Sequence, residues 1–189
     1  MSRGLTPSQT VGPYFSIALN QLTRSDLATA GGEGERVTIQ GRVLDGDGQP
    51  VSDALIEIWQ ANAHGKYGHP EDVQDKPLEK DFLGWGRVAT NANGEYSFTT
   101  VKPGRVPGPG GTLQAPHINV AMFMRGLLLQ LVTRIYFASE NSNGEDPVLN
   151  LLDPERRSTL MASEVSGRKN VLEWNVVCSG ENETVFFEY

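Results

Sequence analysis

Apolar and polar residues alternate along several short segments of this chain, which is the period-two pattern of half-buried β-strands. Residues 37–43 place Val, Ile and Val around a central glycine and predict a first strand. The Asp-Gly-Asp-Gly run at 45–48 predicts a turn, and residues 54–59 then divide between two faces, with Ala, Ile and Ile on one of them. We therefore expect these two strands to form a hairpin in the sheet core.

The strongest two-residue hairpin signal in the chain is Asn93 followed by Gly94. It lies between residues 87–90 and 95–100, which we predict as another pair of strands. The 21 Gly and 11 Pro residues are scattered between short runs of Val, Ile, Thr, Tyr and Phe without any repeat, so many short strands joined by turns are expected. The remaining predicted strands are 118–124, 129–137, 171–178 and 184–189.

Helical signals are few. Residues 153–162 predict one short helix, because a proline stands at its first position. Residues 6–9 carry a capping pattern for one helical turn, which the glycine and proline at 12–13 end, so we expect an arm with a bend. Residues 24–35 show no periodicity and predict a surface loop, whose unusual length suggests contact with another molecule.

Charge and composition exclude several classes of protein. The net charge is −7 and the Lys and Arg residues are dispersed singly, so we expect no nucleic-acid partner. Residues 1–20 lack the pattern of a signal peptide, and the longest apolar stretch, 127–132, is too short to span a bilayer, so we expect a cytoplasmic protein without membrane contact. The single cysteine, Cys178, cannot form an internal disulfide and stands at a strand position, which predicts a structural role.

Five motifs follow one another along most of the chain, at 37–45, 54–67, 86–98, 101–104 and 135–137. In this order they resemble the intradiol ring-cleavage dioxygenase family. Two end motifs, at 6–14 and 180–189, are similar to the alpha chains of those family members that contain two kinds of subunit. The resemblance implies a mainly β, single-domain β-sandwich of mixed short strands with long loops and one or two short helices. Residues 1–36 would form an arm and surface loop of this domain, and residues 37–189 the sandwich.

The resemblance also implies a position for a metal. Catalytic relatives hold a ferric ion with two tyrosinates and two histidines, and the matching positions here are Tyr67, Val106, His117 and Asn119. Val106 cannot bind a metal, and an asparagine amide replaces imidazole poorly. Two remaining ligands cannot hold Fe(III) against hydrolysis, so we expect vestigial metal-site positions and no iron in this chain. We expect His117 to be a partly buried imidazole that is hydrogen-bonded to the backbone or to Tyr67.

Two other features resemble metal sites and are rejected. His64 and His69 flank Tyr67, but they lie in a Gly- and Pro-containing loop and match no ligand position of the family. Residues 45–56 begin like a calcium loop, yet position six is proline where glycine is needed and position twelve is isoleucine where a glutamate is needed.

The resemblance further implies a partner, namely an iron-bearing beta chain of the same fold. In that assembly the positions matching Thr10, Gly12, Pro13 and Tyr14 in the arm line the beta chain's substrate pocket, and Arg125 reaches the same region. The substrates implied are O2 and a catechol with a ring carboxylate, which a fixed cation would attract and position. No catalytic residue is expected in this chain alone.

Three alternatives remain open from the sequence. Arg125 is also compatible with an ordinary surface or interface salt bridge. The whole chain is compatible with a structural or regulatory homolog that has no enzyme partner, or with a homomeric dioxygenase that uses unforeseen ligands. The long loop at 24–35, the arm ending at Tyr14 and the aromatic run at 185–187 favour an obligate hetero-oligomer instead.

Overall fold

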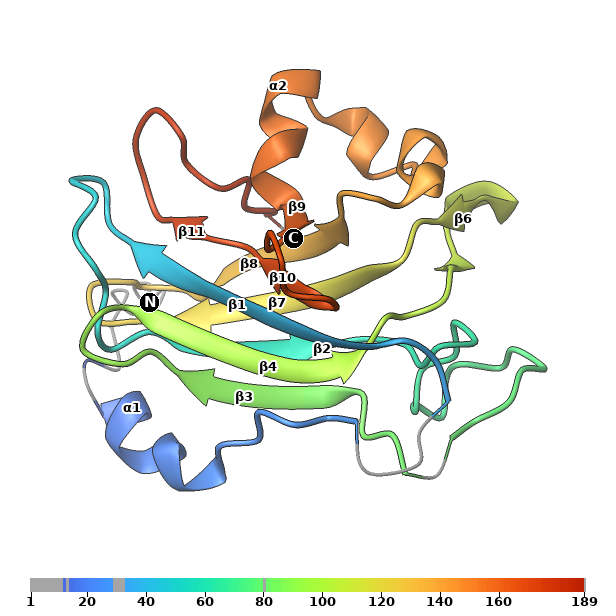
Figure 1. The fold of residues 1–189 in the computed structure, drawn as a ribbon, viewed down its shortest axis with the longest axis horizontal. Coiled ribbons are helices and arrows are strands. Elements are labelled where there is room, and N and C mark those ends of the chain that lie inside the picture. The colour runs from blue at the N-terminus through green and yellow to red at the C-terminus, as the bar shows by residue number, and fades with distance from the viewer. Residues whose placement is uncertain (1–11, 13, 29–32, 80, 189) are drawn as a thin grey trace, which may run out of the picture.

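The chain folds into two packed β-layers, as seen in a computed structural model that describes residues 12, 14–28, 33–79 and 81–188 (Figure 1). One layer contains β1 (Arg36–Leu44), β4 (Glu95–Val101), β10 (Val171–Glu173) and β11 (Val176–Val177), and the other contains β2 (Leu55–Trp59), β3 (Trp85–Ala89), β7 (His117–Phe123) and β8 (Leu131–Phe137). Strand β9 (Met161–Glu164) pairs with both β10 and β8 and thereby joins the layers. The predicted mainly β sandwich is confirmed.

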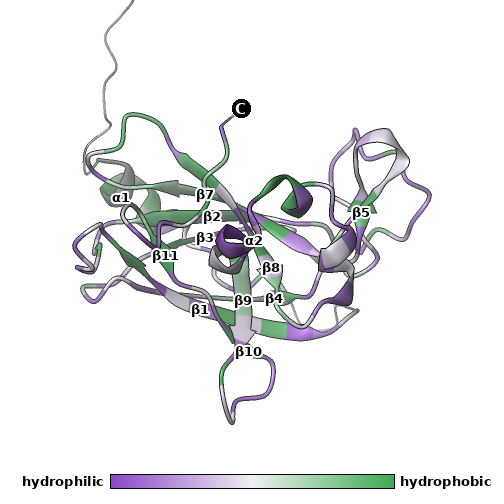
Figure 2. Ribbon diagram, turned by 90° about the horizontal axis from the view of Figure 1, so that it is seen from above, coloured by the Kyte–Doolittle hydropathy of each residue, from purple (hydrophilic) through white to green (hydrophobic). Residues whose placement is uncertain are grey.

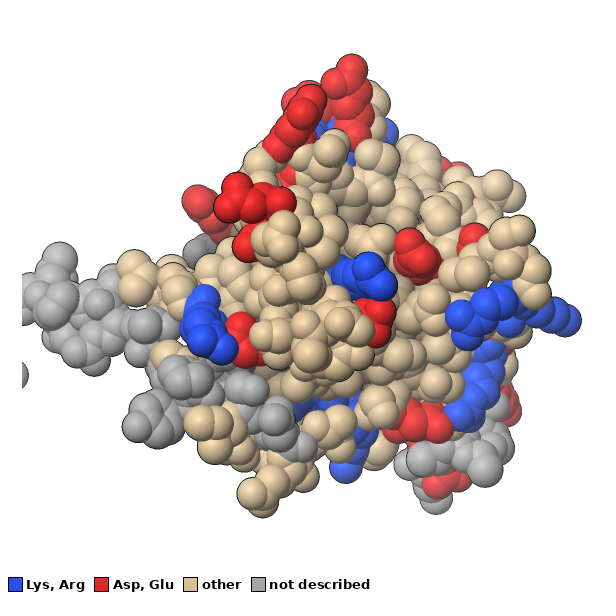
Figure 3. All heavy atoms as spheres, turned by 60° about the vertical axis from the view of Figure 1, so that its left-hand side comes forward, with Lys and Arg blue, Asp and Glu red and all other residues tan. Residues whose placement is uncertain are grey.

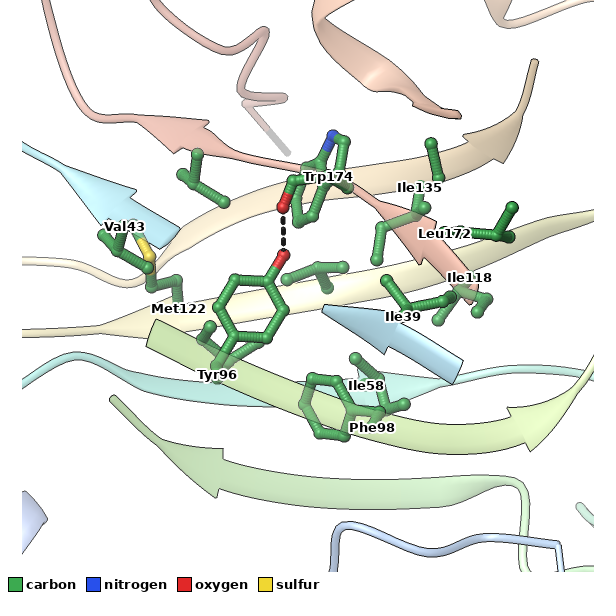
Figure 4. Close-up of a cluster of buried hydrophobic side chains, with 14 of the residues drawn as sticks. Ile39, Val43, Ile58, Tyr96, Phe98, Ile118, Met122, Ile135, Leu172 and Trp174 are labelled. Atoms are coloured by element: carbon green, nitrogen blue, oxygen red, sulfur yellow. Dashed lines mark hydrogen bonds between the residues drawn. The ribbon is translucent and has the colours of Figure 1, made fainter. Parts of the chain in front are cut away.

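A single apolar core fills the space between the layers. The alternating residues of β1 and β2 that the sequence pattern assigned to one face, such as Ile39 and Ile58, are fully or almost fully buried there. Figure 4 shows them packed with side chains from both layers, among them Tyr96, whose hydroxyl donates to the carbonyl oxygen of Trp174 at 2.6 Å. Hydrophobic colouring concentrates on the strands and hydrophilic colouring in the connecting loops (Figure 2). Burial of each large apolar side chain contributes about 1.5–3 kcal/mol.

Both predicted hairpins are wrong as strand pairs. Strand β1 pairs with β4, β10 and β11, whereas β2 pairs with β3 and β7. The turn at Asn93 and Gly94 does form, but β3 and β4 lie in different layers. A type I′ hairpin turn needs positive φ at both central residues, and only Gly94 has it, at 71°. The Asn91 side chain instead accepts from the amides of Asn93 and Glu95 and turns the chain across the sandwich.

Several predicted boundaries also differ. The helix expected over 153–162 consists of α2 (Pro154–Arg157) and the 3-10 turn η5 (Ser158–Leu160), after which β9 begins. The strand expected at 171–178 is divided into β10 and β11. Residues 184–188 are no strand, although Phe187 N donates to the carbonyl oxygen of Val132 at 2.8 Å.

The segment 24–28 closes one edge of the sandwich instead of crossing its surface. Arg24 exchanges two backbone hydrogen bonds with Arg87 of β3, and Leu27 N donates to the carbonyl oxygen of Thr99 of β4. Leu27 is therefore fully buried in the core, which corrects the surface-loop prediction for this part of 24–35. Before it, α1 (Tyr14–Leu19) and the 3-10 turn η1 (Asn20–Leu22) occupy a region where the sequence predicted no helix; the predicted turn at 6–9 lies outside the described residues.

A second, smaller apolar cluster lies on the outer side of β7 and β8. Ala115, Tyr136, Leu149 and Leu160 form its buried part. The 3-10 turns η3 (Asn141–Glu145) and η4 (Leu149–Leu151) and helix α2 lie over this end of the sheets (Figure 1). Beside them a short hairpin is made of β5 (Val106–Pro107), η2 (Pro109–Gly111) and β6 (Leu113–Gln114). In the described part of the chain no helix has the length and apolar character needed to cross a bilayer.

Candidate functional site

The outer face of β7 brings two of the remnant ligand positions together. Ile118 points into the core, so His117 and Asn119, one residue to either side, point to the opposite face. In the β7–β8 register His117 lies opposite Tyr136, and Asn119 lies opposite Arg134. On the other side of β7, Asn119 pairs with Trp59 of β2. Side chains of five neighbouring residues therefore share one patch of the outer sheet surface.

Tyr67 joins this patch from the loop after β2. Its hydroxyl oxygen accepts from Nδ2 of Asn119 at 3.3 Å, and the same amide nitrogen donates to the carbonyl oxygen of Trp59 at 3.2 Å. The rings of Tyr67 and Trp59 pack with centroids 4.7 Å apart. Burial raises the pKa of Tyr67 above its usual value, so the group is a neutral phenol at neutral pH, and its hydroxyl is satisfied by the Asn119 amide.

His117 is almost completely buried, with 4% of its surface exposed. Its Nδ1 donates to the carbonyl oxygen of Ala115 at 2.8 Å, and its ring packs against that of Tyr136 at 5.6 Å. Burial, and then the positive charge of Arg134, lower the pKa of His117 from 6.5 to about 4. The imidazole is therefore neutral at physiological pH, and the expected bond to the backbone is confirmed.

Val106, which the sequence predicted to match the fourth ligand position, lies in the β5–β6 hairpin. It is buried and pairs across the hairpin with Gln114. Its isopropyl group offers no donor atom to a metal. Together with an amide at Asn119, this leaves only Tyr67 and His117 as donors, a set too small to hold a ferric ion. Among the described residues no group of three or more His, Cys, Asp or Glu side chains could hold a metal.

Arg134 is a member of this site that the sequence interpretation missed. Its Nη1 donates to Oε1 of Gln114 at 2.8 Å and to the hydroxyl of Tyr136 at 3.2 Å. The Tyr136 hydroxyl in turn donates to Oδ1 of Asp146 at 3.3 Å, and this fully buried carboxylate also accepts from the backbone amide of Ala115 at 2.7 Å. Burial raises the pKa of Tyr136 further above its usual range than that of Tyr67. Arg134 lies beside Asn119 because of the register between β7 and β8, and this register cannot be predicted from the sequence.

The two rejected histidines have other partners. Nε2 of His64 lies 2.7 Å from Oε2 of Glu33, and the ring of His69 meets that of Trp59 edge-on with centroids 6.2 Å apart. Cys178 is partly buried with Sγ 3.9 Å from Sδ of Met124, and burial raises its pKa to about 11. This thiol is unreactive at neutral pH, which agrees with a structural role.

Of the predicted substrate-binding residues, Arg125 lies beyond the end of β7 and apart from this patch. Thr10 and Pro13 lie outside the described residues, Gly12 has a positive φ of 60°, and Tyr14 begins α1. Arg125 follows β7, and its Nε lies 2.5 Å from Oδ2 of Asp53; the arginine side chain is 67% exposed and that of Asp53 14%. The side of the molecule seen in Figure 3 carries isolated Lys and Arg side chains rather than a basic stripe. Substrate contact by these residues stays a prediction.

Comparisons with known proteins agree with this fold. A family profile described as a dioxygenase matches residues 10–180, and the chain belongs to the intradiol dioxygenase family. It is 42% identical to the protocatechuate 3,4-dioxygenase alpha chain of Pseudomonas putida, over 97% of this chain and 96% of the relative. It is 36% identical to the protocatechuate 3,4-dioxygenase beta chain of Burkholderia cepacia, over 87% of this chain and 73% of the relative.

A solved structure shows the same architecture. The dioxygenase domain of a dioxygenase carbohydrate-binding protein fusion from Streptomyces sp. SirexAA-E superposes with a TM-score of 0.64 at 25% identity, covering 84% of this chain and 89% of that one.

Proposed function

We propose that this chain is the alpha subunit of a protocatechuate 3,4-dioxygenase. The assembled enzyme would open the aromatic ring of protocatechuate between its two hydroxyl-bearing carbons, adding both atoms of O2 to form 3-carboxy-cis,cis-muconate, a step of the beta-ketoadipate route of aromatic catabolism. The observation that carries the proposal is the 42% identity to an alpha chain over nearly the full length of both proteins. A cytoplasmic location stays a prediction of the sequence.

The catalytic Fe(III) would be held by the partner beta chain and not by this chain. The support is chemical: of the four ligand positions implied by the family, Val106 has no donor atom and Asn119 has an amide in place of an imidazole, so only Tyr67 and His117 stay as donors. The pronounced similarity to a beta chain supports a partner of the same fold. Like domains that pair about a pseudo-twofold axis can contribute residues to each other's pockets, so the loss of one metal site leaves the other dependent on both chains.

The contribution of this chain would be substrate electrostatics and shape. Thr10, Gly12, Pro13 and Tyr14 would line the beta chain's pocket, and the Arg125 guanidinium would face the substrate carboxylate. For this, Arg125 must exchange Asp53 for the substrate. A charge-assisted hydrogen bond to the substrate carboxylate contributes about 1.5–3 kcal/mol, and this must exceed what is lost when the 14% exposed Asp53 carboxylate gives up its pair.

Co-expression with the beta chain tests this proposal. We expect a stable hetero-oligomer that turns over protocatechuate with O2 uptake, while this chain alone shows no turnover. Failure of the two chains to associate, with this chain monomeric and folded at micromolar concentration, would favour the structural or regulatory homolog. Turnover by this chain alone would favour the homomeric dioxygenase.

A further inference from the structure

A fixed positive charge, the guanidinium of Arg134, lies beside two of the predicted ligand positions, His117 and Asn119. Arg134 lies directly opposite Asn119 on the same face of the β7–β8 pair, and such residues have Cβ atoms about 4.5–5.5 Å apart. Its guanidinium is held by Gln114 from the β5–β6 hairpin and by Tyr136 from β8. The ring of Phe187 covers it, with the guanidinium carbon 6.0 Å from the ring centre.

This charge is not neutralised by a direct partner. None of the ion pairs among the described residues includes Arg134. Its Nε is buried without a hydrogen-bond partner in the described part of the chain. The carboxylate of Asp146 reaches it only through the Tyr136 hydroxyl. A guanidinium stays protonated at any physiological pH, so the positive charge here is permanent.

We propose that Arg134 takes the electrostatic place of the metal, so that its guanidinium, held by Gln114 and Tyr136, excludes a cation from the predicted ligand positions. This inference rests on the proposed function, in which this chain carries no iron. The missing ligands are one reason why no metal binds, and the positive charge of Arg134 is a second reason. Repulsion grows with the product of the charges, so a di- or trivalent ion is opposed two or three times as strongly as a proton. Restoring ligands alone would therefore not restore metal binding.

The test compares two variants of the assembled complex. Asn119→His would supply a third donor beside Tyr67 and His117, and it is made with and without Arg134→Gln. Each complex is dialysed to equilibrium against micromolar Zn²⁺, and zinc is counted per chain above that bound by the unsubstituted complex. We expect the double variant to bind one additional zinc with at least about tenfold higher affinity than the single variant.

Two controls distinguish the effect of the Arg134 charge on zinc binding from the effect of its side-chain shape. Arg168 is exposed on a loop, and Arg168→Gln in the Asn119→His background removes the same charge far from the site, so it should leave zinc binding unchanged. Arg134→Lys in that background keeps the charge and should bind zinc no more tightly than the single variant does. Circular dichroism verifies that each variant is folded, and Arg134→Met serves as a second neutral replacement in case Arg134→Gln unfolds.

The outcomes are distinct. Equal zinc binding by the single and double variants, whether both bind or neither does, would overturn the role of Arg134, because the ligands alone would then decide. Iron bound stoichiometrically by the unsubstituted chain would instead overturn the proposed function itself.

Discussion

Arg134 and Asp146 carry opposite charges in the remnant pocket but do not touch, because the hydroxyl of Tyr136 stands between them and bonds to both. At the residue scale, a chain of hydrogen bonds from Gln114 through Arg134 and Tyr136 to Asp146 lies beside the predicted ligand positions. The loss of ligands at Val106 and Asn119 can be predicted by matching the sequence to the family. The role of Arg134 cannot, since it depends on a strand register that local patterns do not specify.

Removal of the Tyr136 hydroxyl, which bridges Arg134 and Asp146, should destabilise the fold more than removal of the Tyr67 hydroxyl. Tyr136→Phe removes one hydrogen bond from the buried Asp146 carboxylate and one from the Arg134 guanidinium. We expect it to lower the free energy of unfolding by about 1.5–3 kcal/mol. The matched control, Tyr67→Phe, breaks one bond between neutral groups and should cost about 0.5–1.5 kcal/mol. Urea denaturation of both variants measures the difference. Equal losses of unfolding free energy would show that the Tyr136 hydroxyl contributes no more to stability than the Tyr67 hydroxyl.

His117 should make the protein sensitive to acid. Its pKa is lowered in the folded state from 6.5 to about 4, so the unfolded chain takes up the proton more readily. The free energy of unfolding therefore has its full value above the unfolded-state pKa of His117 and falls as the pH drops toward the folded-state pKa. Between about pH 7.5 and about pH 5 the loss is about 2 kcal/mol. Urea denaturation at both pH values measures this loss. In His117→Gln the loss should shrink, and an unchanged pH dependence would assign the acid sensitivity to other groups.

At the scale of elements, the sequence predicted where most strands lie but not which strands pair. Alternation placed β1, β2, β7 and β8 correctly because one face of each packs in the core. The prediction of strand pairing was wrong because a turn sequence indicates that the chain reverses direction but not which strand lies beside it. After both predicted turns the chain crosses from one layer to the other. Strand β9 was missed because its four residues follow directly on a helical turn. The division between β10 and β11 at Trp174 depends on the distant Tyr96, which no local pattern can show.

The segment 24–28 should be important for stability because it closes the edge between β3 and β4. Leu27→Ala removes a fully buried side chain, and we expect the free energy of unfolding to fall by about 2–5 kcal/mol. Leu129 is a matched control, since 80% of its surface is exposed, and Leu129→Ala should change stability by no more than about 0.5 kcal/mol. Similar small effects of both substitutions in thermal denaturation would show that the edge segment is dispensable.

At the scale of the whole molecule, the proposed function requires an assembly in which two chains share one pocket. If Arg125 faces the substrate carboxylate there, Arg125→Ala should lower kcat/KM for protocatechuate by about ten- to a hundredfold without loss of iron or of assembly. Plain catechol lacks the carboxylate and should be turned over with unchanged, low efficiency.

Asp53→Ala is the paired control, because it frees Arg125 without removing it. This variant should retain activity toward protocatechuate. An equal loss with both substrates in Arg125→Ala, or a loss in Asp53→Ala as large as in Arg125→Ala, would place Arg125 in a supporting ion pair and not at the substrate.

The central claim is that this chain belongs to a two-subunit dioxygenase in which the partner holds the iron. The most direct measurement is the iron content and visible absorption of this chain purified aerobically alone, beside the co-expressed complex. We expect a colourless chain with no stoichiometric iron and a red complex with about one iron per pair of chains, because tyrosinate bound to Fe(III) absorbs visible light. About one tightly bound iron per chain in the isolated protein would contradict it.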